Sequence, residues 1–366
     1  MINRNEKQKK QTIGSILAGA VGDALGYAVE FFPYSEIVSI YGEKGIRKYD
    51  LKCGKAIISD DTQMTLFTAN GILFGETRAC LRGVAGYPSS YVYFAYLDWL
   101  TTQGYDVSFK TVDQSWLLRV HELHSSRAPG GTCLSALASG KMGSVSEPIN
   151  QSKGCGGVMR IAPYGLFYGH MLNDEPEKFI NEAMEIGAIT HGNPMSHLSC
   201  ALASCIIAKM LFSSCSSIKT AVIDSLDLLR KHTDFKDYDE FSYLINKALK
   251  LSENSLPDVE NIRALGEGWI AEEAIAISVY CACKYQNNLI EGIIAAVNHD
   301  GDSDSTGAIT GNLLGAWLGE TAIPKEYLKD LELRDVIKEI ATDLTTGCPM
   351  SDFDVKYDQA WGDKYI

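Results

Sequence analysis

The chain has 366 residues, of which 46% are hydrophobic and 22% charged, a composition typical of a globular protein rather than a disordered or fibrous one. Its formal net charge of −13, with no basic run beyond KQKK, argues against a broad nucleic-acid-binding face. No apolar run reaches the roughly 20 residues of a membrane helix, and the charged N-terminus lacks a signal peptide's apolar stretch. We therefore expect a cytoplasmic protein without nucleic-acid or membrane partners.

The ten cysteines are scattered and include no C-x2-C pair. Cys200, Cys205, Cys281 and Cys283 lie in apolar helical runs. We expect buried free thiols in a reducing compartment, because a zinc site would need closer ligand spacing.

The first predicted helix spans residues 11–32, which are rich in Ala, Leu and Gly. Gly19, Gly22 and Gly26 share one face of it, and each glycine costs ~1 kcal/mol relative to alanine in a helix. That face is therefore predicted to pack closely against another backbone. Asp23 and Glu30 lie seven residues apart, hence on one face, which either lines a cavity or is simply exposed.

Helical periodicity continues along the rest of the chain. The only possible β pattern is a short hairpin near residues 45–58. We predict one all-α domain over residues 12–366, after a short charged segment at 1–11. The further predicted helices lie at about 60–75, 89–103, 132–139, 177–191, 196–212, 217–231, 238–251, 268–285, 289–297, 306–318 and 334–345.

The stretch ISDDTQM places two acidic residues at a predicted helix start. Ser59 or Asp60 can cap that helix, which explains one polar residue well. Asp60 and Asp61 would splay by ~100° around the helix axis, an arrangement that suits two ions better than one. A simple cap and half of a metal site both remain open.

The stretch NHDGDSDSTG alternates three aspartates with Gly and Ser. It fails as a calcium loop, because Ser305 replaces the turn glycine and Gly311 the bidentate glutamate. A D-x-D-x-T phosphatase motif also fails, since no buried strand precedes it. In an extended segment Asp302 and Asp304 would converge, with Ser305 or Thr306 capping a helix that begins near Gly307. Two such carboxylates suit Mg2+ or Mn2+.

Two glycine clusters and one histidine complete the candidate site. Clustered glycines let backbone N–H groups approach an anion, although such loops are commonly only turns. A lone histidine at a helix end is more often structural than catalytic. The residues are Gly130 and Gly131 in RAPGGT, Gly154, Gly156 and Gly157 in GCGG, and His191.

Taken together, these motifs resemble those of the ADP-ribosylglycohydrolases, including the dinitrogenase-reductase-activating glycohydrolases and the ADP-ribosylarginine hydrolases. The resemblance runs from about residue 12 to at least 345. It implies a compact all-α domain with a binuclear Mg2+ or Mn2+ site. The motifs are GDALGYAVE (22–30), SDDTQM (59–64), RAPGGTCLSAL (127–137), GCGGVMRIAP (154–163), TH (190–191), GEGWIAEEAIA (266–276) and HDGDSDSTGAITGNLLGA (299–316).

The resemblance also implies roles for individual residues. Glu30 is implied as an acid/base that reaches toward the metals, and Asp61 as a second catalytic residue. Asp23 is implied as a nearby second acid at the substrate site, and Asp300 as outer support. The glycines of both loops and His191 would line the ADP-ribose cleft. The implied metal ligands are Ser59, Asp60, Asp61, Asp302, Asp304 and Ser305.

The function implied is hydrolysis of the N-glycosidic bond between ADP-ribose and a protein arginine, with two cations holding the distal ribose and activating a water. Alternatives are a hydrolase of serine-linked or small-molecule ADP-ribose, and a non-catalytic immunity-type binder that blocks a transferase toxin. Such a binder needs a projecting segment, for which residues 1–11 or a loop insertion would have to serve.

Overall fold

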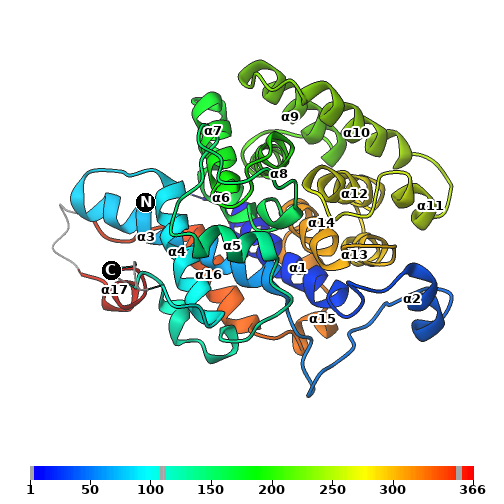
Figure 1. Ribbon diagram of the computed structural model, residues 1–366, viewed down its shortest axis with the longest axis horizontal. Coiled ribbons are helices and arrows are strands. Elements are labelled where there is room, and N and C mark those ends of the chain that lie inside the picture. Colours follow the sequence, from blue (N-terminus) through cyan, green and yellow to red (C-terminus); the bar gives the residue numbers. More distant parts are fainter. Residues whose placement is uncertain (1–3, 108–109, 111–112, 352–356) are drawn as a thin grey trace.

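The structure, a computed structural model, describes residues 4–107, 110, 113–351 and 357–366 as one all-α domain. Over those residues it contains no β-strand (Figure 1). The helices are α1 (Glu6–Gly26), α2 (Tyr34–Tyr41), α3 (Asp60–Arg82), α4 (Pro88–Thr102), α5 (Gly131–Ala138), α6 (Ala162–Tyr168), α7 (Pro176–Ala188), α8 (Pro194–Phe212), α9 (Ile218–His232), α10 (Tyr238–Leu251), α11 (Asp258–Arg263), α12 (Ala271–Lys284), α13 (Leu289–Val297), α14 (Ser303–Leu318), α15 (Lys325–Lys329), α16 (Arg334–Thr346) and α17 (Gln359–Tyr365).

Helices α1 and α14 pack side by side through the middle of the domain, and the other helices surround them (Figure 1). Gly22 lies against Gly307, and Gly26 against Ser303, so the two helices run antiparallel. A side chain at either glycine of α1 would overlap the opposite backbone. The predicted glycine face is thus confirmed, and it brings the C-terminal end of α1 to the N-terminal end of α14.

The described part of the N-terminal segment, residues 4–11, packs on the rest of the domain. Helix α1 begins at Glu6, five residues before the predicted start, and Asn5 and Gln8 form a reciprocal capping box. Arg4 is buried and donates hydrogen bonds to the carbonyl oxygens of Leu344 and Leu166. Part of the charged segment 1–11 is therefore docked on the core.

Three local predictions are wrong. Helix α1 ends at Gly26, so Glu30 lies in the following turn and not on the same helix face as Asp23. The possible hairpin at 45–58 is reduced to one antiparallel bridge between Lys52 and Lys55 without strands, and Ala56 pairs with Leu331 in a second isolated bridge. The short helices α2, α6, α11, α15 and α17 were not foreseen. Four of them have five to seven residues, and tertiary packing stabilises helices too short to persist alone.

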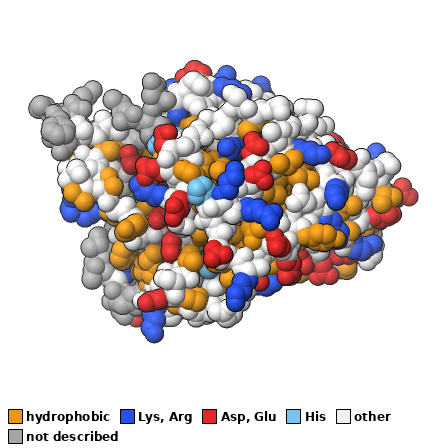
Figure 2. Space-filling view, turned by 90° about the horizontal axis from the view of Figure 1, so that it is seen from above, with side chains coloured by type: hydrophobic (Ala, Val, Ile, Leu, Met, Phe, Trp, Pro, Cys, Tyr) orange, Lys and Arg blue, Asp and Glu red, His pale blue; other side chains and the backbone are white. Residues whose placement is uncertain are grey.

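Helix α8 is long and apolar enough to cross a membrane by length and composition alone. However, 89% of the relevant window is buried inside the protein, as expected of a core helix. All ten cysteines lie within the described residues and are free, as predicted, but only five of them are buried and Cys53 is exposed. Acidic and basic side chains are interspersed over the face drawn in Figure 2.

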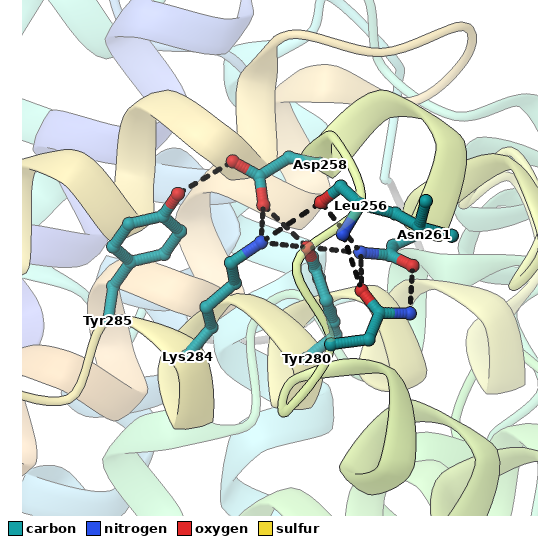
Figure 3. Close-up of polar contacts among 7 residues, drawn as sticks. Leu256, Asp258, Asn261, Tyr280, Lys284 and Tyr285 are labelled. Carbon is teal, nitrogen blue, oxygen red and sulfur yellow. Dashed lines mark hydrogen bonds and ion pairs between the residues drawn. The ribbon is translucent and has the colours of Figure 1, made fainter.

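A polar cluster fastens α11 to α12 (Figure 3). Asp258 accepts hydrogen bonds from Lys284 at 2.8 Å and from the hydroxyl groups of Tyr280 and Tyr285. Asn261 also donates to the Tyr280 hydroxyl at 3.1 Å. The cluster fixes the helix that leads into residues 264–270, a segment that reaches the candidate site.

Candidate functional site

A cavity of about 180 Å³ lies where the N-termini of α3, α5 and α14 meet. Each helix N-terminus carries partial positive charge and free N–H groups, so the position favours anions and carboxylates. The lining residues are Glu30, Asp60, Asp61, Ala128, Gly130, Gly131, Thr132, Cys133, Gly154, Cys155, Gly156, Met159, His191, Trp269, Asp302, Asp304 and Ser305.

The start of α3 supplies Asp60 and Asp61. Ser59 is the N-cap, and its hydroxyl accepts the Asp61 N–H at 3.2 Å. Both the cap and the two cavity-lining acids are therefore present, so the two interpretations of this stretch are compatible. Ser59 itself is buried beneath the cavity and does not line it.

Asp23 does not line the cavity itself but lies behind it, as the resemblance implies for a nearby second acid. Its carboxylate accepts the backbone N–H of Ser59 at 2.9 Å and that of Thr62 at 3.1 Å, together with the Thr62 hydroxyl. Asp23 is fully buried and ties the end of α1 to the start of α3. Its contribution is to position the helix that carries Asp60 and Asp61.

The start of α14 supplies the opposite acids. Asp302 is the N-cap and accepts the Ser305 N–H at 3.3 Å, and Asp304 lies in the first turn. The helix thus begins four residues earlier than predicted, and the two aspartates do not share an extended strand. They still reach one cavity, together with Ser305.

Residues 266–271 hold the acidic turn against the glycine loop. The Asp302 N–H donates to the Glu267 carbonyl at 2.9 Å, and the Cys155 N–H donates to the Trp269 carbonyl at 3.2 Å. Gly268, with φ of +87°, lies beside Thr306, where a side chain would be both strained and crowded. This segment therefore fixes the distance between two walls of the cavity.

Asp300 stands outside the cavity. It accepts the Tyr34 N–H at 2.8 Å and forms an ion pair with Arg263 at 2.9 Å. It thereby links α2 and α11 to the acidic turn, an arrangement consistent with outer support.

The carboxyl groups in the cavity repel one another and are poorly solvated. Burial, followed by the charge of Asp304, raises the pKa of Asp61 well above its usual value, and the pKa values of Asp60 and Asp302 shift in the same way. Burial and the nearby aspartates raise the pKa of Glu30 to about 10. Without a counter-charge, these carboxyl groups therefore keep their protons to a higher pH than exposed carboxyl groups would.

Two oxygens in this cluster lack hydrogen-bond partners. Oδ2 of Asp61 and Oε2 of Glu30 are buried and accept no hydrogen bond. A buried carboxyl oxygen without a partner is costly, so it calls either for a proton, as at Glu30, or for a ligand that supplies positive charge. Among the described residues no three His, Cys, Asp or Glu side chains already enclose a single ion. The donor set, all carboxylate and hydroxyl oxygen, fits hard cations.

The glycine loops have unequal roles. The Gly130 N–H donates to Oδ2 of Asp60 at 3.3 Å, and space is open above Gly130 and Gly131. The Gly154 N–H is already bonded to the Ser152 hydroxyl at 3.2 Å. Gly157 lies outside the cavity against Ser196, which contradicts its prediction as a lining residue. The α5 start is therefore the better place for an anion.

Sequence reasoning missed several lining residues, notably Cys155 and Trp269. The Cys155 thiol donates to Oδ2 of Asp302 at 2.8 Å, and Trp269 stacks on the exposed ring of Phe31 with centroids 6.0 Å apart. Both missed residues lie inside quoted motifs, GCGG and GEGW. Their position within these motifs was the one sequence signal that could have marked them as cavity-lining residues.

A larger hollow of about 830 Å³ lies beside α7. Two of its acids are occupied by backbone donors, Glu182 by Ser89 and Glu185 by Val145. None of the carboxylates that line it is both buried and unpartnered. The smaller cavity therefore remains the candidate site.

Solved structures define the class of fold. A chain described as an ADP-ribosylglycohydrolase-related protein complex superposes with a TM-score of 0.63, covering 93% of this chain and 98% of that one at 21% identity. This likeness establishes a shared all-α fold.

Sequence comparisons define the family. An uncharacterized protein of Archaeoglobus fulgidus is 28% identical, covering 90% of this chain and 94% of its own. The ADP-ribosyl-[dinitrogen reductase] glycohydrolase of Rhodospirillum rubrum is 25% identical, covering 88% and 91%. The model of the ADP-ribosylglycohydrolase family matches residues 4–352. The chain belongs to the ADP-ribosylglycohydrolase family, and is a hydrolase of that class.

Proposed function

We propose that this protein is a metal-dependent hydrolase that removes ADP-ribose from modified protein side chains, with arginine as the modified residue. The observation that carries the proposal is the buried, unpartnered oxygens of Asp61 and Glu30 in a cavity walled by acids from two helix N-termini. Arginine linkage rests on the resemblance to the dinitrogenase-reductase-activating branch.

Two divalent cations, Mg2+ or Mn2+, are the proposed cofactors. When bound, they would supply Lewis-acid polarisation and lower the pKa of a coordinated water. Their positive charge would also relieve the repulsion among the buried carboxyl groups. The residues proposed to hold them are Asp60, Asp61, Asp302, Asp304 and Ser305, which line the cavity, with Ser59 beneath them as the cap of α3 that fixes Asp61.

Glu30 is the proposed proton donor. Burial is the largest cause that raises the pKa of Glu30 and so favours its protonated form, and the turn that carries it lies outside both metal-binding helix starts. A protonated carboxyl group can transfer its proton to the departing side chain as the glycosidic bond breaks. Asp61 is the second proposed catalytic residue, because it lines the same cavity and has a carboxyl oxygen without a partner.

The size of the cavity supports a substrate that is only partly enclosed. Its volume of about 180 Å³ is below the roughly 300–1,000 Å³ of typical ligand sites. The cavity would therefore enclose the distal ribose, and the pyrophosphate would lie near the start of α5. The modified protein would remain outside, beside the exposed Phe31 and Trp269.

The test is a hydrolysis assay with a panel of arginine-linked, serine-linked and small-molecule ADP-ribose substrates, with and without a chelator. We expect release of ADP-ribose from the arginine-linked protein, and loss of the activity in chelator and in Asp302→Ala. Activity that survives chelation would contradict the metal mechanism. If the enzyme prefers a serine-linked substrate, its target is modified serine and not modified arginine.

A non-catalytic binder that blocks a transferase toxin gains no support from the described part of the N-terminal segment, residues 4–11. Arg4 is buried, and residues 6–11 are part of α1. Protection of a toxin's target by a catalytically inactive Asp302→Ala variant would nevertheless favour that role.

The ten free thiols support the proposed cytoplasmic location.

A further inference from the structure

His191 reaches the cavity wall from the core, and two fully buried residues lie behind it. Oγ1 of Thr190 is 2.6 Å from Nη2 of Arg160 and 2.8 Å from Nδ1 of His191. All three side chains are at most 2% exposed. They form a continuous polar chain from the interior to the candidate site.

The chemistry of the donors assigns the hydrogens in this chain. A guanidinium group only donates, so the Thr190 oxygen accepts from Arg160. The single hydroxyl hydrogen of Thr190 then needs an acceptor. The Cys133 sulfur lies nearby, but sulfur is a weak acceptor and already receives a hydrogen bond from Arg160 at 3.4 Å. The better acceptor is Nδ1 of His191, which leaves the ring hydrogen on Nε2.

Arg160 also keeps the imidazole neutral. Its guanidinium stacks over the Tyr96 ring at 4.2 Å, and besides Thr190 it donates to the sulfur atoms of Met64 and Cys133. Burial, the charge of Arg160 and that of His197 lower the pKa of His191 to about 3. His197 lies on the other side, where its Nε2 is 2.8 Å from the His191 carbonyl oxygen.

The glycine loop leaves room for the outer edge of the ring. A Cβ atom on Gly154 would lie 3.0 Å from Nε2 of His191, and one on Gly156 would lie 2.8 Å from Cε1. Both glycines and His191 line the cavity. These glycines therefore let an imidazole edge approach the cavity, in addition to any role for their own amides.

We propose that Arg160 and Thr190 are positioning residues that fix His191 as a neutral imidazole with its hydrogen on Nε2, a permanent donor to an oxygen of the bound ligand. The inference deepens the proposed function and rests on it, because the oxygen would belong to the ribose or phosphate groups of ADP-ribose. Unlike an ordinary histidine, His191 would donate the same hydrogen bond throughout the neutral pH range.

Nitrogen-15 NMR of the full-length protein tests the assignment without any ligand. We expect His191, identified by loss of its signals in His191→Gln, to show a protonated Nε2 and an unprotonated Nδ1 unchanged from pH 5 to 9. Thr190→Ser retains the hydroxyl and should keep this tautomer. Thr190→Val should give a mixture of tautomers, and should weaken ADP-ribose binding about 3- to 10-fold by calorimetry, the worth of one hydrogen bond.

A wild-type His191 protonated on Nδ1, or titrating above pH 5, would overturn the proposal even if Thr190→Val failed to fold. A folded Thr190→Val protein with an unchanged tautomer would overturn it as well. If the tautomer is as expected but ADP-ribose does not bind the wild type, the positioning role is supported and the proposed function is contradicted.

Discussion

Gly22 of α1 and Gly307 of α14 lie in mutual contact, so that a Cβ atom added to either would overlap the carbonyl oxygen of the other. This contact sets the spacing of the two central helices. Since α14 begins with the acids of the site and α1 ends beside them, the spacing of the two glycines also sets the geometry of the cavity.

Gly22→Ala should therefore destabilise the protein by about 1–3 kcal/mol or more, because the methyl group overpacks backbone that cannot move away. Chemical denaturation measures the change. Gly131→Ala is the matched control, because a methyl group there meets no atom within 4 Å. Equal stability of the two variants would show that the helices can separate without cost.

Asp61→Asn should change how stability depends on pH in the presence of a chelator. In the unfolded chain this carboxyl ionises near 3.8, whereas in the folded protein burial and Asp304 raise its pKa well above that value. The folded state then binds more protons, so the wild type loses stability as pH rises above about 4. The variant should lose less over the same range in thermal melts.

The same variant should lose the response to cations. Mg2+ or Mn2+ should raise the melting temperature of the wild type, because binding to the folded state alone stabilises it. The rise should disappear in Asp61→Asn and persist in Asp335→Asn, which removes an exposed carboxylate. An equal rise in both variants would place the cations elsewhere.

Glu30→Gln should lower kcat by about 10²–10⁴-fold, because the amide cannot transfer a proton. The cation-induced rise in melting temperature should remain, since Glu30 is not among the proposed metal ligands. Single-turnover rates on an ADP-ribosylated protein measure the loss. A rate within threefold of the wild type would remove Glu30 from the mechanism.

Arg4→Ala should destabilise the protein by about 2–4 kcal/mol, because it removes charge-assisted hydrogen bonds and leaves buried carbonyl groups unpaired. The guanidinium also lies 5.8 Å from the ring centroid of Phe167. Lys7→Ala, at an exposed position of α1, should be neutral. A neutral Arg4→Ala would mean that the segment before α1 is held loosely.

Local sequence patterns were enough to predict part of the candidate site. The cap at Ser59, the glycine face of α1 and the acidic starts of two helices follow from residue type and spacing, and the structure contains them. The same reasoning failed for Glu30, since Gly26 to Glu30 has helical composition but the chain turns after Gly26 to reach the cavity. Helix propensity alone does not predict where tertiary contacts end a helix.

By itself the sequence determined an all-α domain, its family, and the acids that gather at helix starts, because helix periodicity, capping and motif order are properties of neighbouring residues. Only the tertiary structure decided which residues face the cavity. Asp23 and Gly157 lie outside the cavity, whereas Cys155 and Trp269 line it. These positions depend on contacts between distant segments, such as Cys155 with Asp302, or between different helices, such as Asp23 with the start of α3. The hydrogen bonds from Arg160 through Thr190 to His191 likewise depend on tertiary packing. Arg160 and Thr190 are thirty residues apart, and no local sequence pattern predicts their contact.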